Sequence, residues 1–169
     1  MLLELIQYYA KAENKPKHNL SFIFWDGHHA DLIGSRAFAK ELPLEEFGNV
    51  HAYIDLDTVA NPKPMVSIVT TAANRHARDV WLAQQWTDFF KAKNKTVQLS
   101  TSTLSKTDAA AFARKIPVVG LTFTDVNAQQ TDGCTKAQCE QFNEMSVDSM
   151  QLAAEALEYL IQQIAQAAQ

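Results

Sequence analysis

Residues 20–38, which read LSFIFWDGHHADLIGSRAF, decide the fold. The first six residues, LSFIFW, are a continuous apolar run before Gly27, and such a run predicts a strand buried on both faces. A helix over residues 30–41 is expected to follow. His28 and His29 therefore lie where a predicted strand turns toward a helix. The pair could be a metal site, the remnant of one, or two polar residues at an ordinary loop.

Strands and helices alternate through the rest of the chain. Residues 1–13 predict an amphipathic helix that ends before Pro16, because proline cannot continue a helix. Further strands are expected over 50–57, 64–70, 96–100 and 116–123, helices over 74–93 and after Ser146, and one or two helical turns over 107–114. Asn74 and Ser146 are suitable helix N-caps. This alternation predicts an α/β sandwich with a largely parallel sheet.

Two of the predicted helices carry apolar stripes that should face the core. In the 74–93 helix the stripe is Val80, Trp81, Leu82, Trp86, Phe89 and Phe90, and in the last helix it is Met150, Ala153, Leu157, Leu160, Ile161 and Ile164. Aromatic residues at helical spacing favour core packing over a binding platform.

Composition excludes several function classes. The chain has 169 residues, of which 47% are hydrophobic, so we expect one compact domain. Its 15 basic residues are scattered and its net charge is −4, which argues against nucleic acid as a partner. No apolar run reaches the length of a membrane span, and the amino-terminal sequence MLLELIQYYAKAENKPK does not resemble a signal peptide.

The two cysteines, Cys134 and Cys139, lie in a polar loop of about 20 residues that is long enough to be a functional candidate. Their spacing could close a small disulfide loop, which would indicate an oxidising compartment, or they could be two free thiols. The spacing is not that of a zinc knuckle.

Polar residues at strand ends are the candidate site. Ligands bind beyond the carboxyl ends of strands in such sheets, so His28, His29 and Asp57 should share one rim. Asp57 could instead cap a turn, and Asp108 could cap a helix. The remaining histidines, His18, His51 and His76, have no partners suggested by spacing, and we interpret them as surface or satisfied polar residues.

Five segments match the motifs of a known family in the same order. LLELIQYYAK is similar to a helix LLELAR, FIFWDGHHADLIGSRAF to W-G-x-E-E-x-G-L-x-G-S-x-x-(Y/F), and AYIDLDTVANPKP to N-L-D-M-(V/I)-G. TDAAAFARKIPVVGL is similar to S-D-H-x-P-F-x-x-x-G-I-P, and DGCTKAQCEQFNEMSVDSM to D-P-C-Y-H-x-x-C-D-T-x-x-N. Together they resemble the co-catalytic two-zinc exopeptidases, which include bacterial secreted aminopeptidases and glutamate carboxypeptidase.

The resemblance implies a three-layer sandwich with a mixed, mainly parallel sheet, and a single domain over residues 1–169 that lacks the family's amino-terminal ligand-bearing part. By position, the family's general base Glu falls on His28, its ligand Glu on His29, its ligand Asp on Asp57 and its last ligand His on Lys136. The first ligand His and the bridging Asp would lie before Met1. The cysteine match implies a disulfide between Cys134 and Cys139 and a periplasmic or secreted location.

These substitutions change the expected chemistry. His29 and Asp57 could still hold one zinc ion weakly, since a neutral imidazole can replace a carboxylate as ligand. A protonated Lys136 offers no lone pair and would repel a dication. His28 could accept a proton in place of the missing Glu. We therefore expect no zinc or one weakly bound ion, and as a hypothesis the Lys136 ammonium neutralises Asp57 where zinc would have done so.

The family strand that bears the first ligand lies between those that resemble LSFIFW and AYIDLD. Because unpaired strand edges carry unsatisfied amides, either those two strands now pair directly with each other or another chain supplies the missing strand, by self-association or from a partner. The sequence thus predicts an inactive peptidase-like domain that acts as a binding or assembly module, with a peptide-like ligand also compatible. The alternatives are a metal-dependent aminopeptidase completed by a missing segment or partner chain, and a protein that binds a single metal through His29 and Asp57.

Overall fold

The computed structural model describes residues 1–62, 64–71, 76–101, 104–123 and 145–167. Several residues singled out above lie outside these ranges, namely Asn74, Cys134, Lys136 and Cys139. The expected disulfide and the expected place of Lys136 beside Asp57 therefore stay predictions.

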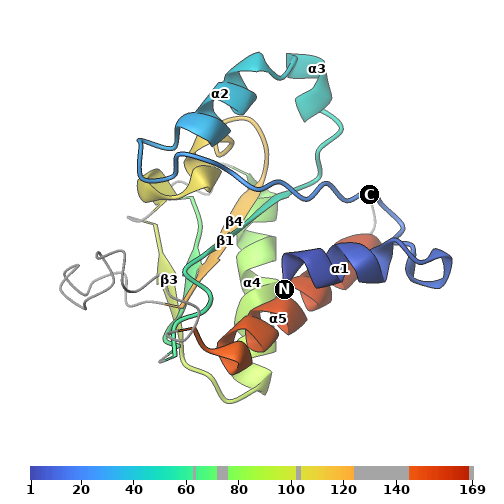
Figure 1. Cartoon of the computed structure of the whole chain (residues 1–169), viewed down its shortest axis with the longest axis vertical. Coiled ribbons are helices and arrows are strands. Elements are labelled where there is room, and N and C mark those ends of the chain that lie inside the picture. The colour runs from blue at the N-terminus through green and yellow to red at the C-terminus, as the bar shows by residue number, and fades with distance from the viewer. Residues whose placement is uncertain (63, 72–75, 102–103, 124–144, 168–169) are drawn as a thin grey trace.

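A four-stranded sheet forms the centre of the molecule (Figure 1). Its strands are β1 (Tyr53–Asp57), β2 (Val66–Val69), β3 (Val97–Ser100) and β4 (Val118–Thr122), in the order β1-β4-β2-β3. The β1/β4 and β2/β3 pairs are parallel and the β2/β4 pair is antiparallel. The predicted α/β class with a mixed, mainly parallel sheet is confirmed.

Helices occupy most of the ranges expected for them. They are α1 (Leu2–Tyr9), α2 (Ile33–Glu41), α3 (Leu44–Phe47), α4 (Ala77–Ala92) and α5 (Val147–Gln166), with short 3-10 turns η1 (Ala12–Asn14), η2 (Leu104–Lys106) and η3 (Asp108–Ala111). Ser146 caps α5 as predicted, because its side chain accepts a hydrogen bond from the Ser149 amide at 3.2 Å. The predicted start of α4 at Asn74 is wrong, since His76 is its N-cap. In the described part of the chain, none of the helices has the length and apolar character needed to cross a bilayer.

The main core lies between one face of the sheet and helices α4 and α5. Trp86 and Phe90 of α4 are fully buried there, together with Leu82, Val66, Ile68, Val119, Leu121, Ala153, Ala156 and Leu160. The Trp86 indole Nε1 donates a hydrogen bond to the Ala156 carbonyl at 2.8 Å, which ties α4 to α5. The prediction for Val80 is wrong, since it is 47% exposed. Residues 82, 86 and 90 are spaced by four and form the buried ridge, and Val80 lies off that ridge.

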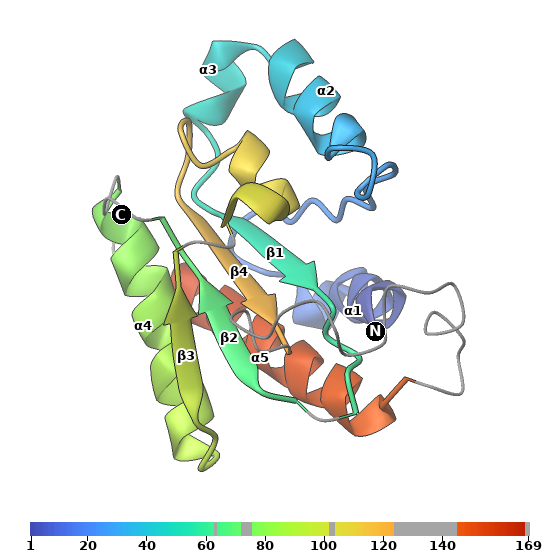
Figure 2. The ribbon, with the colours of Figure 1, turned by 90° about the vertical axis from the view of Figure 1, so that its left-hand side faces the viewer.

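A second apolar cluster packs around the beginning of β1 and β4. Val118 is buried there against Phe112, Ala109, Ile116, Ala113, Phe47 and Ala39, with Trp25 and Tyr53 at its margin. Figure 2 shows α2 and α3 together at one end of the molecule, with α5 behind the sheet. Helical segments thus flank the sheet on two sides, and the second cluster supports the turn that carries the histidine pair.

The strand predicted over residues 20–25 is not formed. The stretch runs from α1 across the sheet to the turn before α2 (Figure 1), and among the described residues no backbone hydrogen bond to another backbone group involves residues 15–26. Leu20 and Phe22 pack toward α1 and α5, whereas Phe24 is 61% exposed. An apolar run becomes a strand only beside a partner, and β1, one of the two edge strands of the described sheet, pairs only with β4.

Truncation of the most central side chain tests this account of the core. Trp86→Ala should lower the free energy of unfolding by about 3–5 kcal/mol, because it removes a fully buried ring and its hydrogen bond to α5. Urea unfolding followed by circular dichroism measures the change. If Trp86→Ala does not fold, Trp86→Phe should still fold and show a smaller decrease in the free energy of unfolding. Val80→Ala on the exposed side of α4 should change stability by less than about 0.5 kcal/mol, and an equal loss in both variants would contradict the assignment of the core.

Candidate functional site

A glycine-dependent turn presents the histidine pair. Gly27 has a φ of 69°, and a Cβ there would lie 2.3 Å from Ile33 Cγ2. A Cβ on Gly34 would lie 2.5 Å from the Asp26 carbonyl oxygen. Both positions therefore require glycine, because a side chain would overlap the turn itself. The turn is held tightly against the start of α2, which fixes the direction of His28.

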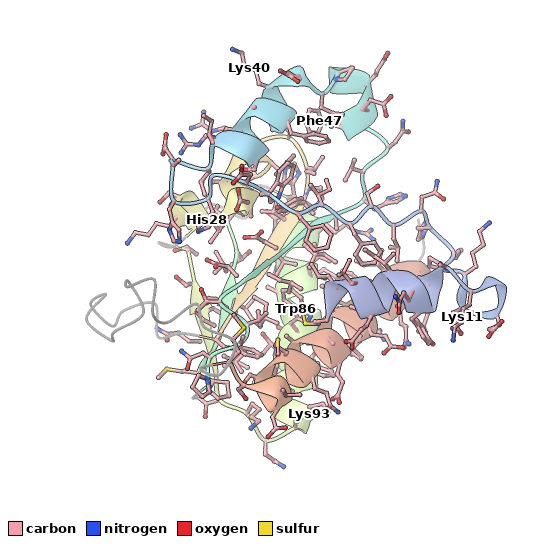
Figure 3. All side chains as sticks on the ribbon, viewed as in Figure 1. Lys11, His28, Lys40, Phe47, Trp86 and Lys93 are labelled. Carbon is pink, nitrogen blue, oxygen red and sulfur yellow. The ribbon has the colours of Figure 1, made fainter. Side chains whose placement is uncertain are left out.

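His28 lies between two carboxylates from distant parts of the chain. Its Nδ1 donates a hydrogen bond to Asp108 Oδ2 at 2.8 Å, and its Nε2 lies 4.0 Å from Asp57 Oδ2. Asp57 is the last residue of β1, and its Oδ1 accepts a hydrogen bond from Thr58 Oγ1 at 3.0 Å. Figure 3 labels His28 at the turn that leads into α2, on the opposite side of the view from Lys11. The structure thus brings His28 and Asp57 to one rim.

Asp108 is the buried member of this group. It is 6% exposed, and its Oδ1 has no hydrogen-bond partner among the described residues. The interpretation of Asp108 as a helix cap is wrong, since Thr107 is the N-cap of η3 and the Asp108 side chain turns to His28 instead. A buried carboxylate needs a partner, and His28 supplies it.

A third carboxylate, Asp55, lies beneath the rim. It is 7% exposed, and its Oδ1 accepts a hydrogen bond from the Tyr53 hydroxyl at 3.2 Å. That hydroxyl accepts a hydrogen bond from the Trp25 indole at 2.8 Å, and the Tyr53 ring stacks on Phe112 with centroids 4.4 Å apart. Tyr53, Asp55 and Asp57 alternate along β1 and so share one face of the sheet. That alternation was the available sequence signal for Asp55 and Tyr53, which were not predicted as site residues.

The surroundings of His28 act on its pKa in opposite directions. Partial burial lowers the pKa, whereas the hydrogen bond to Asp108 and the negative charges of Asp57, Asp108 and Asp55 raise it. The raising contributions prevail, so the pKa of His28 is above its ordinary value. The surroundings therefore favour the protonated form of His28 more than bulk water does.

Burial acts on the pKa of Asp55 in the opposite direction, because it penalises the charged carboxylate. Burial and the charges of Asp57 and Asp108 raise the pKa of Asp55 to about 7, although the Tyr53 hydroxyl and the Ala109 amide donate hydrogen bonds to it. Burial and the charge of Asp55 also raise the pKa of Tyr53. Asp55 thus exchanges its proton near neutral pH while Tyr53 stays protonated. The charges of Asp57 and Asp108 thus act on the pKa values of both His28 and Asp55.

His29 lies apart from this network. It is exposed, and its ring contacts that of His28 edge to face with centroids 5.2 Å apart. Within the described ranges, no three side chains of histidine, cysteine, aspartate or glutamate converge as a metal-binding group. Asp57 and His29 remain predicted ligands, and the described residues bring His28, rather than His29, to Asp57.

Comparisons with known proteins agree with the fold. The model of peptidase family M28 matches residues 1–161. Leupeptin-inactivating enzyme 1 of Streptomyces exfoliatus is 22% identical over 175 residues, which cover 95% of this chain and 38% of that enzyme. A zinc aminopeptidase from Bacillus subtilis superposes with a TM-score of 0.66 at 13% identity, covering 86% of this chain and 36% of that one. The LapA aminopeptidase of Legionella pneumophila superposes with a TM-score of 0.66 at 15% sequence identity, and the match covers 88% of this chain and 39% of that one. The chain thus spans less than half the length of these relatives.

Removal of the Asp108 carboxylate tests the origin of the raised His28 pKa. In Asp108→Asn the pKa of His28 should fall, because the charged hydrogen-bond acceptor is gone while partial burial remains. Titration of the histidine ring protons by NMR measures it. A raised pKa stabilises the fold below the unfolded value of His, and this stabilisation disappears as pH rises through the folded pKa. Asp108→Asn should therefore cost about 1–3 kcal/mol near pH 6 and less near pH 9. An unchanged His28 titration would contradict the assignment.

Replacement of Asp55 should stabilise the protein above neutral pH. The unfolded chain loses the Asp55 proton near pH 4 and the folded chain near pH 7, so the folded state is penalised as pH rises through this window. Asp55→Asn keeps an acceptor for Tyr53 without the charge. Relative to the wild type, its free energy of unfolding should increase between about pH 5 and pH 8 by on the order of 2 kcal/mol. Asp88→Asn, at an exposed carboxylate of α4, is the control and should show no such increase.

Proposed function

The chain belongs to peptidase family M28, and from that premise we propose that it acts as a binding and assembly module and does not cleave peptides with a pair of zinc ions. The observation that carries the proposal is the position of His28 between Asp108 and Asp57. In the motif resemblance, His28 replaces the general base Glu. Both ring nitrogens of His28 already face carboxylates, Nδ1 at 2.8 Å from Asp108 Oδ2 and Nε2 at 4.0 Å from Asp57 Oδ2, so the imidazole is engaged in the network rather than held for a water molecule as a general base would be.

Zinc is the metal named for the Bacillus subtilis aminopeptidase, and the described residues do not fit a pair of zinc ions. The Nδ1 of His28 is engaged by Asp108, and its Nε2 faces Asp57. In the protonated form this imidazole has no free lone pair for a metal. His29 is exposed and has no carboxylate partner among the described residues. Zinc therefore has no part in the proposed function.

The charge balance of the rim supports the same conclusion. Asp57 and Asp108 carry two negative charges, and the imidazolium of His28 offsets one of them at short range. Protonation of Asp55 near neutral pH removes another charge from the cluster. The rim is thus stabilised by protons, in the place where a metal ion would otherwise be needed. Lys136 could add a further positive charge, which remains a hypothesis.

The open side of β1 supports an assembly role. β1 pairs only with β4 within the described sheet, so its outer edge is available for another strand. The stretch 15–26 packs near β1, since Leu20 and Phe22 belong to the same apolar cluster as Ile54 and Leu56, and it has no backbone partners in the described chain. Ile23 is 39% exposed and Phe24 61% exposed. Addition of a strand would satisfy backbone groups and cover apolar side chains, which is a common mode of peptide recognition.

A second candidate is a metal-dependent aminopeptidase completed by a further segment or a partner chain. The observation that favours it is the coverage of the relatives, because the chain spans 38% of leupeptin-inactivating enzyme 1 and 36% of the Bacillus subtilis aminopeptidase. A third candidate is a single metal held by His29 and Asp57. Each makes a distinct prediction about metal content that depends on Asp57.

Metal content and turnover distinguish these candidates. We expect purified protein dialysed against zinc to have the same zinc content as Asp57→Asn, and we expect no hydrolysis of aminoacyl-4-nitroanilides, because protons on His28 and Asp55 would already offset part of the carboxylate charge at the rim. Two Asp57-dependent zinc ions together with turnover would favour the peptidase. One Asp57-dependent ion without turnover would favour the single-metal protein.

Analytical ultracentrifugation of the same protein tests whether it self-associates. We expect concentration-dependent association, or capture of a synthetic β-strand peptide, that Phe24→Lys weakens because it places a charge on the apolar stretch. Val80→Lys is the matched control, since Val80 is 47% exposed on α4, away from β1. A strictly monomeric protein that captures no such peptide would contradict the assembly role.

A further inference from the structure

We infer that His18 and His51 form a transition-metal site, separate from the rim around His28. The two histidines lie 33 residues apart in the sequence, His18 in the stretch before LSFIFW and His51 two residues before β1. Their ring centroids are 4.9 Å apart and the ring planes are inclined by 54°. His18 is partly exposed and His51 is exposed, in agreement with their interpretation as surface residues, and the fold in addition places their rings in contact, which their spacing in the sequence did not suggest.

The ring separation suits two ligands on one ion. Neutral imidazole nitrogens bind zinc at about 2.0–2.1 Å, and two rings on a tetrahedral ion then have centroids on the order of 5 Å apart. The observed 4.9 Å agrees with that arrangement. The inclined planes also exclude a face-to-face stack of the two rings. Water would complete the coordination of an ion held by two protein ligands.

Both rings are free to act as ligands. Among the described residues, neither imidazole has a hydrogen bond or an ion pair that would compete for its nitrogens. His18 is half-buried and His51 is exposed, so an ion can reach the pair from solvent. His28, by contrast, has Nδ1 engaged by Asp108. Imidazole pairs of this kind accept Zn²⁺, Ni²⁺ or Cu²⁺, whereas Mg²⁺ and Ca²⁺ prefer oxygen ligands.

A metal at this place would attach a stretch of irregular structure to the sheet. Residues 15–26 make no backbone hydrogen bond to another backbone group within the described chain and are held by side chains such as Leu20, Phe22 and Trp25. An ion shared by His18 and His51 would link this stretch to the start of β1. Such a link suppresses local opening, because metal binding to the folded state alone adds to its stability. The ion would thereby help to hold in place the segment that leads to Trp25 and His28.

Zinc titration of the whole chain tests the site. Isothermal titration calorimetry should show Zn²⁺ binding that is weakened at least about tenfold in His18→Ala and in His51→Ala, since loss of an outer partner alone typically costs that much. His76→Ala, which removes a histidine outside the pair, is the matched control and should bind as the wild type does. In NMR spectra the ring protons of His18 and His51 should shift together on addition of Zn²⁺.

Amide hydrogen exchange supplies a readout that does not depend on affinity alone. Zinc should slow exchange in residues 15–26 of the wild type and leave it unchanged in His18→Ala. Should His51→Ala fail to fold, His51→Gln gives the same comparison with a polar side chain retained. If zinc affinity is unchanged in the His18 and His51 variants but falls in His29→Ala, the inference is overturned, because the ion then binds at the rim. Absence of zinc binding to the wild type would also overturn it.

Discussion

The hydrogen bond between Asp108 and His28 is the interaction on which the rim depends. It joins residues 80 apart in the sequence, one in the turn before α2 and one at the start of η3. Without it the buried carboxylate of Asp108 would have no charged partner, and His28 would have no fixed orientation toward Asp57. The glycines at 27 and 34 matter for the same reason, since they allow the turn to bring His28 within reach of that carboxylate.

The carboxylates of the rim act electrostatically on the strand beneath it. Trp25 and Tyr53 fix the carboxyl of Asp55, and its burial together with the charges of Asp57 and Asp108 raises its pKa to about 7. A proton on Asp55 or His28 lowers the repulsion among the carboxylates. The motif N-L-D-M quoted for the two-zinc exopeptidases has Asn at the position of Asp55, so this chain adds a carboxylate where the motif has a neutral amide.

Sequence reasoning succeeded where a single segment determines its own structure. Buried runs predicted all four strands of the described sheet, and Ser146 was recognised as a cap because capping is local. The stretch 20–25 failed because strand formation depends on a neighbour that no local pattern reveals. The partners of His28 and the contact between His18 and His51 come from residues distant in the sequence, and only the fold brings them together.

The pairing of β1 with β4 also bears on how the chain is made. Tyr53 is aligned with Val118, so β1 has no partner until some 65 further residues have left the ribosome. During that interval β1 and the preceding apolar stretch are exposed, and such nascent segments are prone to aggregate or to engage chaperones. Pairings between distant residues also form slowly because a long loop must close first. During its synthesis the chain therefore passes through a period in which apolar segments that are paired or packed in the folded protein are exposed.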